Sequence, residues 1–264
     1  MQPRSLTPRL LRAVLASAGL VLALAWSGPA AAYSCGNPSS DHCYGVTSWT
    51  EQPQYFGAYT DAKQVAMACP SSCGGFVDDE IWLVDDNSSG CTANSFQMCW
   101  MEAGTLMTAG ANHPQFFWAE SKPAGGSGFT LHIVGNADAA GTVDHYMIIK
   151  DGRQHTSNLF QVWIYNTSLS TLYHGTSTGN AMSGERILLG QELAGSSGAS
   201  AGTAHFTRNI WAVQVLGPEY VFWYNRQVHD GGVSSDNPPF ASWAVHPSSP
   251  PPPEGGDFTT HCCS

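Results

Sequence analysis

Short apolar or alternating runs follow one another from Phe76 to about Tyr224, separated by Gly, Asn, Ser and Asp. The runs are rich in Val, Ile, Phe, Trp and Tyr, which favour strands. Many short strands with regular turn signals are typical of an all-β sandwich or barrel. The predicted strands are Glu80–Val84, Phe96–Ala103, Gln115–Ser121, Gly128–Val134, Thr142–Lys150, Leu159–Asn166, Thr171–Gly175, Arg186–Leu193, His205–Leu216 and Tyr220–Tyr224.

The flanking segments have a different composition from this central part. Residues 33–75 are rich in Cys, Gly, Pro and Ser, so we expect a stapled N-terminal segment before a core at 76–230. Within that segment, the pattern of Thr60–Met67 predicts a short helix. Residues 231–264 form a Pro-rich tail that ends in a Cys pair, and its Pro/Ser run should be extended.

The composition excludes some classes of protein. Apolar residues make up 42% of the 264 residues, so the chain can bury a core. The charge is acidic, with 20 Asp and Glu against 10 Lys and Arg. Because a basic, phosphate-tracking surface is missing, we expect no nucleic-acid partner.

The first 32 residues have the pattern of a signal peptide. A stretch with three arginines and no acid precedes the apolar run Ala13–Trp26, and an Ala-Ala-Ala sequence then predicts cleavage before Tyr33. The alternative is a membrane anchor, for which the run is short. We therefore expect a secreted protein, without a membrane partner after cleavage and monomeric. Loss of the three arginines would change the net charge from −10 to −13.

An even number of cysteines in an exported chain predicts disulfides. We expect the local pairs Cys69–Cys73 and Cys91–Cys99. The adjacent Cys262 and Cys263 would then pair with the remaining two, Cys35 and Cys43, although spacing alone leaves the connectivity open. Zinc is the rival interpretation, and it is weak because Cys69 and Cys73 have no matching second pair.

Two glutamates lie at the ends of apolar strands, where a charge is costly unless it is paired or functional. Alternation places Glu102 on one strand face with Trp100. Glu192 likewise shares a face with Leu188 and Gly190. Two nearby carboxyls in an apolar setting can divide into one protonated and one ionised group, which suits water activation together with proton donation. The alternative is that each is a solvent-facing acid at a strand end.

An ordered series of short motifs gives these glutamates a context. The series consists of Ile81-Trp82-Leu83-Val84, Met101-Glu102-Ala103-Gly104, Phe116-Phe117-Trp118, Leu189-Gly190-Gln191-Glu192-Leu193 and Ala204-His205-Phe206-Thr207-Arg208-Asn209-Ile210. In order and spacing it resembles the neprosin-type glutamic peptidases, whose more distant relatives are the fungal eqolisins. The second glutamate motif reads Gly190-Gln191-Glu192 here instead of Gly-Gly-Glu.

The resemblance implies a fold and an activity. It implies an antiparallel β-sandwich with a concave substrate cleft, and an acid endopeptidase that acts on peptide or protein substrates without a cofactor. The catalytic pair would be Glu102 and Glu192, and the neprosin-type preference would be cleavage on the carboxyl side of proline. Trp100, Trp118 and Glu120 are candidates for lining the substrate cleft, although Trp is more often a core residue.

Other chemistry is less well supported. The ten histidines are scattered without an H-E-x-x-H motif, so we expect no catalytic metal. Two other functions stay open. One is a non-catalytic, secreted β-sandwich that binds polysaccharide or protein through an aromatic face. The other is a glycosidase that uses the two acids.

Overall fold

The fold was analysed in a computed structural model of the chain, and all of the described residues belong to one compact unit, Ala32–Ser264. The structure describes residues 42–49, 55–85, 98–121, 128–150, 159–177, 186–194, 199–214, 221–225, 244–247 and 258–261. These residues are nearly all in strands. In this part of the chain the helical element is a 3-10 turn at Ser71–Cys73, and no helix is long and apolar enough to cross a membrane.

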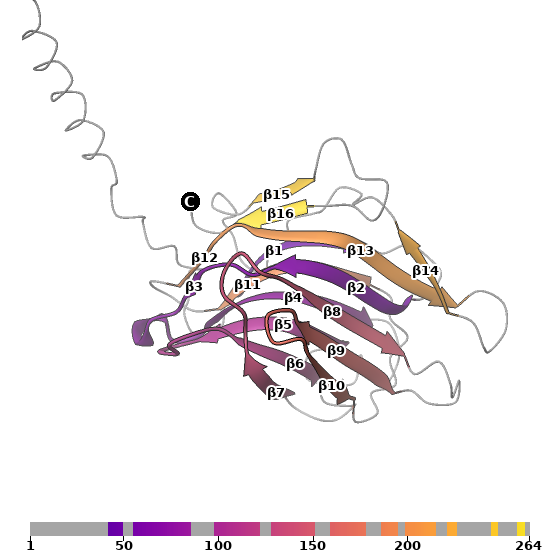
Figure 1. Cartoon of the computed structure of the whole chain (residues 1–264), viewed down its shortest axis with the longest axis horizontal. Helices are drawn as coiled ribbons and strands as arrows, with labels where there is room; N and C mark the ends of the chain where they lie inside the picture. Colours follow the sequence, from indigo (N-terminus) through magenta and orange to yellow (C-terminus); the bar gives the residue numbers. More distant parts are fainter. Residues whose placement is uncertain are drawn as a thin grey trace, which may run out of the picture. The chain divides into compact units, whose positions relative to one another are not determined.

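The strands form two antiparallel sheets that pack in layers (Figure 1), so the predicted all-β, antiparallel sandwich is confirmed. The first, here sheet A, has the order β1-β11-β4-β5-β6-β7. Its strands are β1 (His42–Trp49), β11 (Arg186–Ala194), β4 (Phe76–Asp85), β5 (Cys99–Thr108), β6 (Gln115–Ser121) and β7 (Phe129–Asn136).

The second sheet, here sheet B, has the order β10-β9-β8-β2-β13-β16-β15, and β14 also pairs with β13. Its strands are β10 (Thr171–Thr176), β9 (Phe160–Asn166), β8 (Val143–Lys150), β2 (Tyr55–Lys63), β13 (Ala204–Gln214), β16 (Phe258–His261), β15 (Ala244–Pro247) and β14 (Val221–Asn225). Two short strands, β3 (Met67–Ala68) and β12 (Ser200–Ala201), pair with each other.

Each of the ten predicted strands is present, with ends that differ by a few residues, and Gln115–Ser121 has the predicted bounds. The helix predicted at Thr60–Met67 is wrong, because β2 ends at Lys63 and is followed by β3. Ala58 and Ala62 alternate with the outward Tyr59 and point into the core. β1 and β2 come from the segment 33–75, and β15 and β16 come from the tail 231–264, so both flanking segments supply strands to the sheets.

The core lies between the two sheets. Sheet A contributes Ile81, Leu83 and Phe116, and sheet B contributes Ile148 and Phe160, each almost completely inaccessible to solvent. Burial of apolar side chains at this scale is the main free-energy gain of folding. The opposite face of sheet A is therefore turned away from the main core.

A polar network bridges the two sheets inside this core. Thr105 of β5 donates a hydrogen bond of 2.9 Å to the Gln64 side chain, and its hydroxyl lies 2.6 Å from the Tyr146 hydroxyl of β8. Gln64 donates to Tyr146 as well. Buried polar groups that are satisfied in this way fix the relative position of the sheets.

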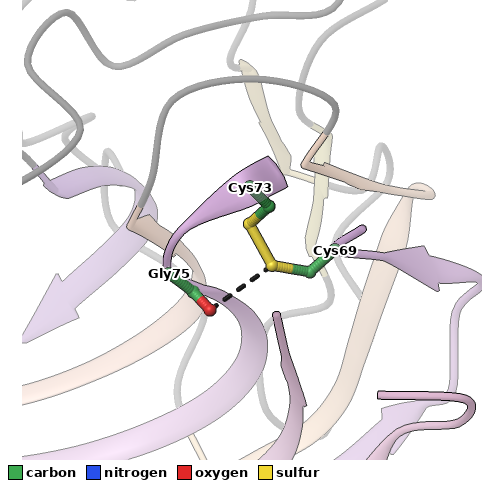
Figure 2. Close-up of a disulfide and its surroundings, with 3 residues drawn as sticks. All are labelled: Cys69, Cys73 and Gly75. Atoms are coloured by element: carbon green, nitrogen blue, oxygen red, sulfur yellow. Dashed lines mark hydrogen bonds between the residues drawn. A yellow bond between two sulfur atoms is a disulfide. The ribbon is translucent and has the colours of Figure 1, made fainter. Parts of the chain in front are cut away.

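A disulfide staples the turn that leads into β4. Cys69 and Cys73 are bonded across the 3-10 turn, as predicted, and the Cys69 sulfur faces the carbonyl oxygen of Gly75 (Figure 2). Cys99 is also disulfide-bonded. Its predicted partner Cys91 lies outside the described residues, as do Cys35, Cys262, Cys263 and the side chain of Cys43.

β4 and β5 approach each other closely at Gly104. A methyl group at Gly104 would lie 2.1 Å from the backbone oxygen of Asp79 and 2.6 Å from the Glu80 Cβ. The backbone cannot give way there without breaking the pairing of the two central strands. This close approach requires glycine as the last residue of the Glu102-Ala103-Gly104 motif.

We expect Gly104→Ala to lower the free energy of unfolding by about 1–3 kcal/mol, because overpacking in a buried sheet forces backbone shifts. Gly202→Ala is the matched control, since a methyl group there makes an ordinary contact at 3.5 Å. Urea unfolding of both variants measures the difference. If Gly104→Ala were as stable as Gly202→Ala, the close approach would not constrain this position.

Candidate functional site

Four carboxyl side chains lie on the face of sheet A that is turned away from sheet B. Asp78 and Glu80 are two residues apart on β4, so they point to the same side. Glu192 of β11 pairs directly with Asp78. Glu102 of β5 pairs with Trp82, which follows Glu80 on the same face. We call Asp78, Glu80, Glu102 and Glu192 the acidic cluster.

Apolar side chains border the acidic cluster at both ends. Toward one end of β4, Trp82, Val84 and Trp100 form a buried group with Val46 of β1. Leu106 lies toward the other end and forms a second group with Phe117 and Ala119 of the neighbouring strand β6, against which Phe76 packs. The carboxyls therefore occupy a polar band between two apolar patches, where little water screens their charges.

Glu102 is the member of the cluster with the most solvent access. Its side chain is partly exposed, and its Oε2 accepts a hydrogen bond of 2.9 Å from the indole nitrogen of Trp100. The same face of β5 thus presents both residues, as the alternation predicted. The indole fixes the orientation of the carboxyl group that a substrate could reach.

Asp78, Glu80 and Glu192 are packed much more tightly. One oxygen from each lies within 4.8 Å of the others, and the three residues are 2%, 1% and 6% exposed. Oδ1 of Asp78 also accepts a hydrogen bond of 3.0 Å from the backbone nitrogen of Glu192. The side chain of one acid therefore holds the main chain of another.

Burial raises the pKa of Asp78 well above its ordinary range, and the nearby charge of Glu192 raises it further. The pKa of Glu80 is raised in the same way, first by burial and then by Asp78, Glu102 and Glu192. Carboxylates this close cannot all be ionised at once, so the cluster retains at least one proton over a wide pH range. A hard cation could take the place of that proton.

The sequence predicted Glu102 and Glu192 but missed Asp78 and Glu80. The sequence pattern predicted Glu80 as the first residue of a strand and left Asp78 outside it, and it gave neither acid a role in a site. The structure corrects this, because β4 begins at Phe76 and the run alternates across the sheet. The usable signal was that alternation, which places Asp78 and Glu80 on the face of Trp82.

Two of the predicted cleft residues lie on the other face of sheet A. Trp118 of β6 pairs with Ala103 and belongs to the main core, where its ring stacks on His132 at 3.8 Å. Glu120 pairs with Met101, another core residue, and is 1% exposed. Neither shares a face with the acidic cluster, whereas Trp100 does.

An exposed apolar stripe lies on the same face as the acidic cluster. Phe129, Leu131 and Ile133 of β7 are 48%, 41% and 44% exposed. Leu131 pairs with Ala119, which in turn pairs with Glu102, so the stripe is two strands away from the most accessible carboxyl. No motif in the sequence marked these three residues as part of a site.

The last motif of the series lies on sheet B, away from the acidic cluster. Arg208 interrupts the pairing of β13 with β2, has a φ of 51° and approaches Asp61 at 3.3 Å. Asn209 is buried and accepts a hydrogen bond of 2.6 Å from Thr60. These contacts shape the β2–β13 pairing, so this motif is structural in the present fold.

The fold is shared with solved structures of a peptidase. A crystal structure of scytalido-glutamic peptidase with a transition state analog inhibitor matches 84% of this chain and 100% of its own, with a TM-score of 0.52 and 9% identity. A second, with a peptide based transition state analog, matches 85% and 98%, with a TM-score of 0.50 and 9% identity. No protein-family model and no curated protein matches the chain. At this identity the likeness shows a common fold and nothing further.

The buried acids give the protein a characteristic pH dependence of stability. Burial raises the pKa of Asp79, on the core face of β4, from 3.8 to about 8. Between these values the folded protein binds more protons than the unfolded chain, so the free energy of unfolding falls as the pH rises. Asp78 and Glu80 act in the same direction.

We therefore expect Asp79→Asn to flatten this fall, because the amide stays neutral at every pH. Urea unfolding of the parent and variant across the range from about 4 to about 8 measures the slope. Equal slopes for the two proteins would show that Asp79 titrates normally in the folded state.

Proposed function

We propose that the chain is an acid endopeptidase of the glutamic type, with Glu102 and Glu192 as the pair that activates water. One observation carries the proposal. Both glutamates lie on the same face of one sheet, in a band of carboxyls between apolar patches. A fold shared with scytalido-glutamic peptidase supports it.

The chemistry needs one ionised and one protonated carboxyl. Glu192, as the carboxylate, takes a proton from a water molecule while the water oxygen attacks the scissile carbonyl carbon. Glu102, as the acid, donates a hydrogen bond and then its proton to the developing oxyanion. When the tetrahedral intermediate collapses, the C–N bond breaks, the amine takes the proton from Glu192, and the new carboxylic acid returns one to Glu102.

The assignment of the two roles follows exposure and orientation. Glu102 is partly exposed and is oriented by Trp100, which places it where a substrate carbonyl can reach it. Glu192 is 6% exposed, and its backbone is anchored by Asp78. With the roles exchanged, Glu102 would be the base and Glu192 the acid. Acidic pH favours catalysis in both cases, because one proton must remain on the pair.

The substrate class that fits this face is an extended peptide with apolar side chains. An extended chain alternates its side chains, and the stripe of Phe129, Leu131 and Ile133 repeats with the same period along β7. Trp100 lies beside this stripe, with its ring 6.3 Å from that of Phe129. Such a surface offers apolar contact on the face that carries Glu102, two strands away from it.

A binding module without catalysis is the weaker candidate. It would rest on an aromatic face, and Trp118 packs in the core instead. It would also have no use for four carboxyls held together at a cost in free energy. Secretion, a monomeric state and the neprosin-type cleavage after proline remain parts of this proposal.

We expect Glu102→Gln and Glu192→Gln each to lower kcat on a denatured protein substrate at acidic pH by about 10²–10⁴-fold, the usual contribution of a general acid or base. The control is Asp138→Asn, in the turn after β7 and outside the acidic cluster. A peptide set with proline before the cut measures the cleavage preference. Full activity in both glutamine variants would remove the assignment.

We expect Leu131→Ser to raise KM for peptides with apolar side chains by about three- to tenfold, because part of a leucine contact is lost. Leu172→Ser is the matched control, since Leu172 is 55% exposed on β10 of sheet B. Equal KM values for the two variants would place the substrate away from the stripe on β7.

A further inference from the structure

Glu80 occupies the middle of the acidic cluster and has no solvent-facing role. It is 1% exposed and lies on β4, between the strands that carry Glu102 and Glu192. Its direct neighbours across the sheet are Gly104 and Gly190, which have no side chains. No side chain on the neighbouring strands therefore lies directly beside Glu80. Glu102 and Glu192 each lie diagonally from it, one strand to either side.

The hydrogen bonds of Glu80 depend on a proton. Both of its oxygens are buried, and neither meets a donor while the facing carboxyls are ionised. Oxygens of Asp78 and Glu192 both lie within 4.8 Å of a Glu80 oxygen, and Asp78 is the one that shares a side-chain hydrogen bond with Glu80. A hydrogen bond between two carboxyls needs a proton on one of them. Asp78 already accepts the backbone N–H of Glu192, a contact that favours the ionised form of Asp78.

These contacts form a chain that ends at the proposed base. We propose that Glu80 is a protonated positioning residue, which donates a hydrogen bond to the Asp78 carboxylate and thereby holds the main chain of Glu192. This inference rests on the proposed function of Glu192 and adds two residues to it. Glu80 and Asp78 act through Glu192 and do not touch the substrate.

The charged groups that face this pair agree with the assignment. Glu192 faces it from β11 and Glu102 from β5, and both repel a second negative charge on the pair. Among the described side chains on this face of β11, the basic one is Arg186, which pairs with Val84 at the far end of β4. Loss of the Glu80 proton at higher pH would break the chain of hydrogen bonds.

The test compares Glu80→Gln with Glu80→Leu across a pH series of kcat/KM. Gln keeps an N–H donor toward Asp78 and cannot ionise, so we expect activity within about threefold of the parent at the optimum and an alkaline limb that moves to higher pH. Leu has a similar size but no donor, so we expect a loss of about tenfold or more at every pH. Asp79→Asn is the control, because Asp79 is equally buried but faces the core.

A profile for Glu80→Gln that superimposes on the parent profile would overturn the inference, as would equal activities of the Gln and Leu variants. Glu102→Gln tests the proposed function separately, since full activity there removes the catalytic pair whatever Glu80 does. Unfolding against pH gives a readout without catalysis, and we expect Glu80→Gln to flatten the fall in stability. Stabilisation of the parent by millimolar Ca²⁺ at neutral pH would show a cation in place of the proton, and would also overturn the inference.

Discussion

The pairing of β4 between β5 and β11 is the constraint on which the site depends. It brings four carboxyls from three strands onto one face, with oxygens of three of them within 4.8 Å of one another. Side chains of like charge repel at this distance, and burial strengthens the repulsion. The strands stay paired because the other face of the same sheet contributes Ile81, Leu83 and Phe116 to the main core.

Protonation of the carboxyls removes the repulsion on one face of sheet A, so that the apolar packing of the other face can hold the strands together. An acid that must be buried without a cation is stable in its neutral form, so the fold raises the pKa of Asp78, Asp79 and Glu80 together. Their neutral forms can donate hydrogen bonds, as a carboxylate cannot. The raised pKa values of these buried acids make the folded state more stable at acidic pH. They also keep a proton in the cluster, and acid catalysis by a carboxyl pair requires such a proton.

The sequence predicted much of the fold because alternation is a local signal. Gln115–Ser121 has the predicted bounds, and its centre is the apolar run Phe116–Ala119. The faces of Glu102 and Glu192 followed from the same alternation. The helix at Thr60–Met67 failed because Ala62 and Lys63 favour helices by propensity, whereas the pairing of β2 with β8 and β13 decides the structure.

The sequence pattern did not assign Asp78 and Glu80 to the site, because the residues that they meet are far away along the chain. Asp78 meets Glu192 only because β11 pairs with β4, across more than a hundred residues, and no local pattern encodes that register. Seen alone, Asp78-Asp79 has the composition of a turn, and the predicted strand began only at Glu80. Within the sheet, the three acids alternate, so that Asp79 joins the polar side chains of the core while Asp78 and Glu80 join the two motif glutamates. A charged run can therefore lie within a strand, and at Glu80 the neighbours across the sheet are Gly104 and Gly190, which leave space for the carboxyl group.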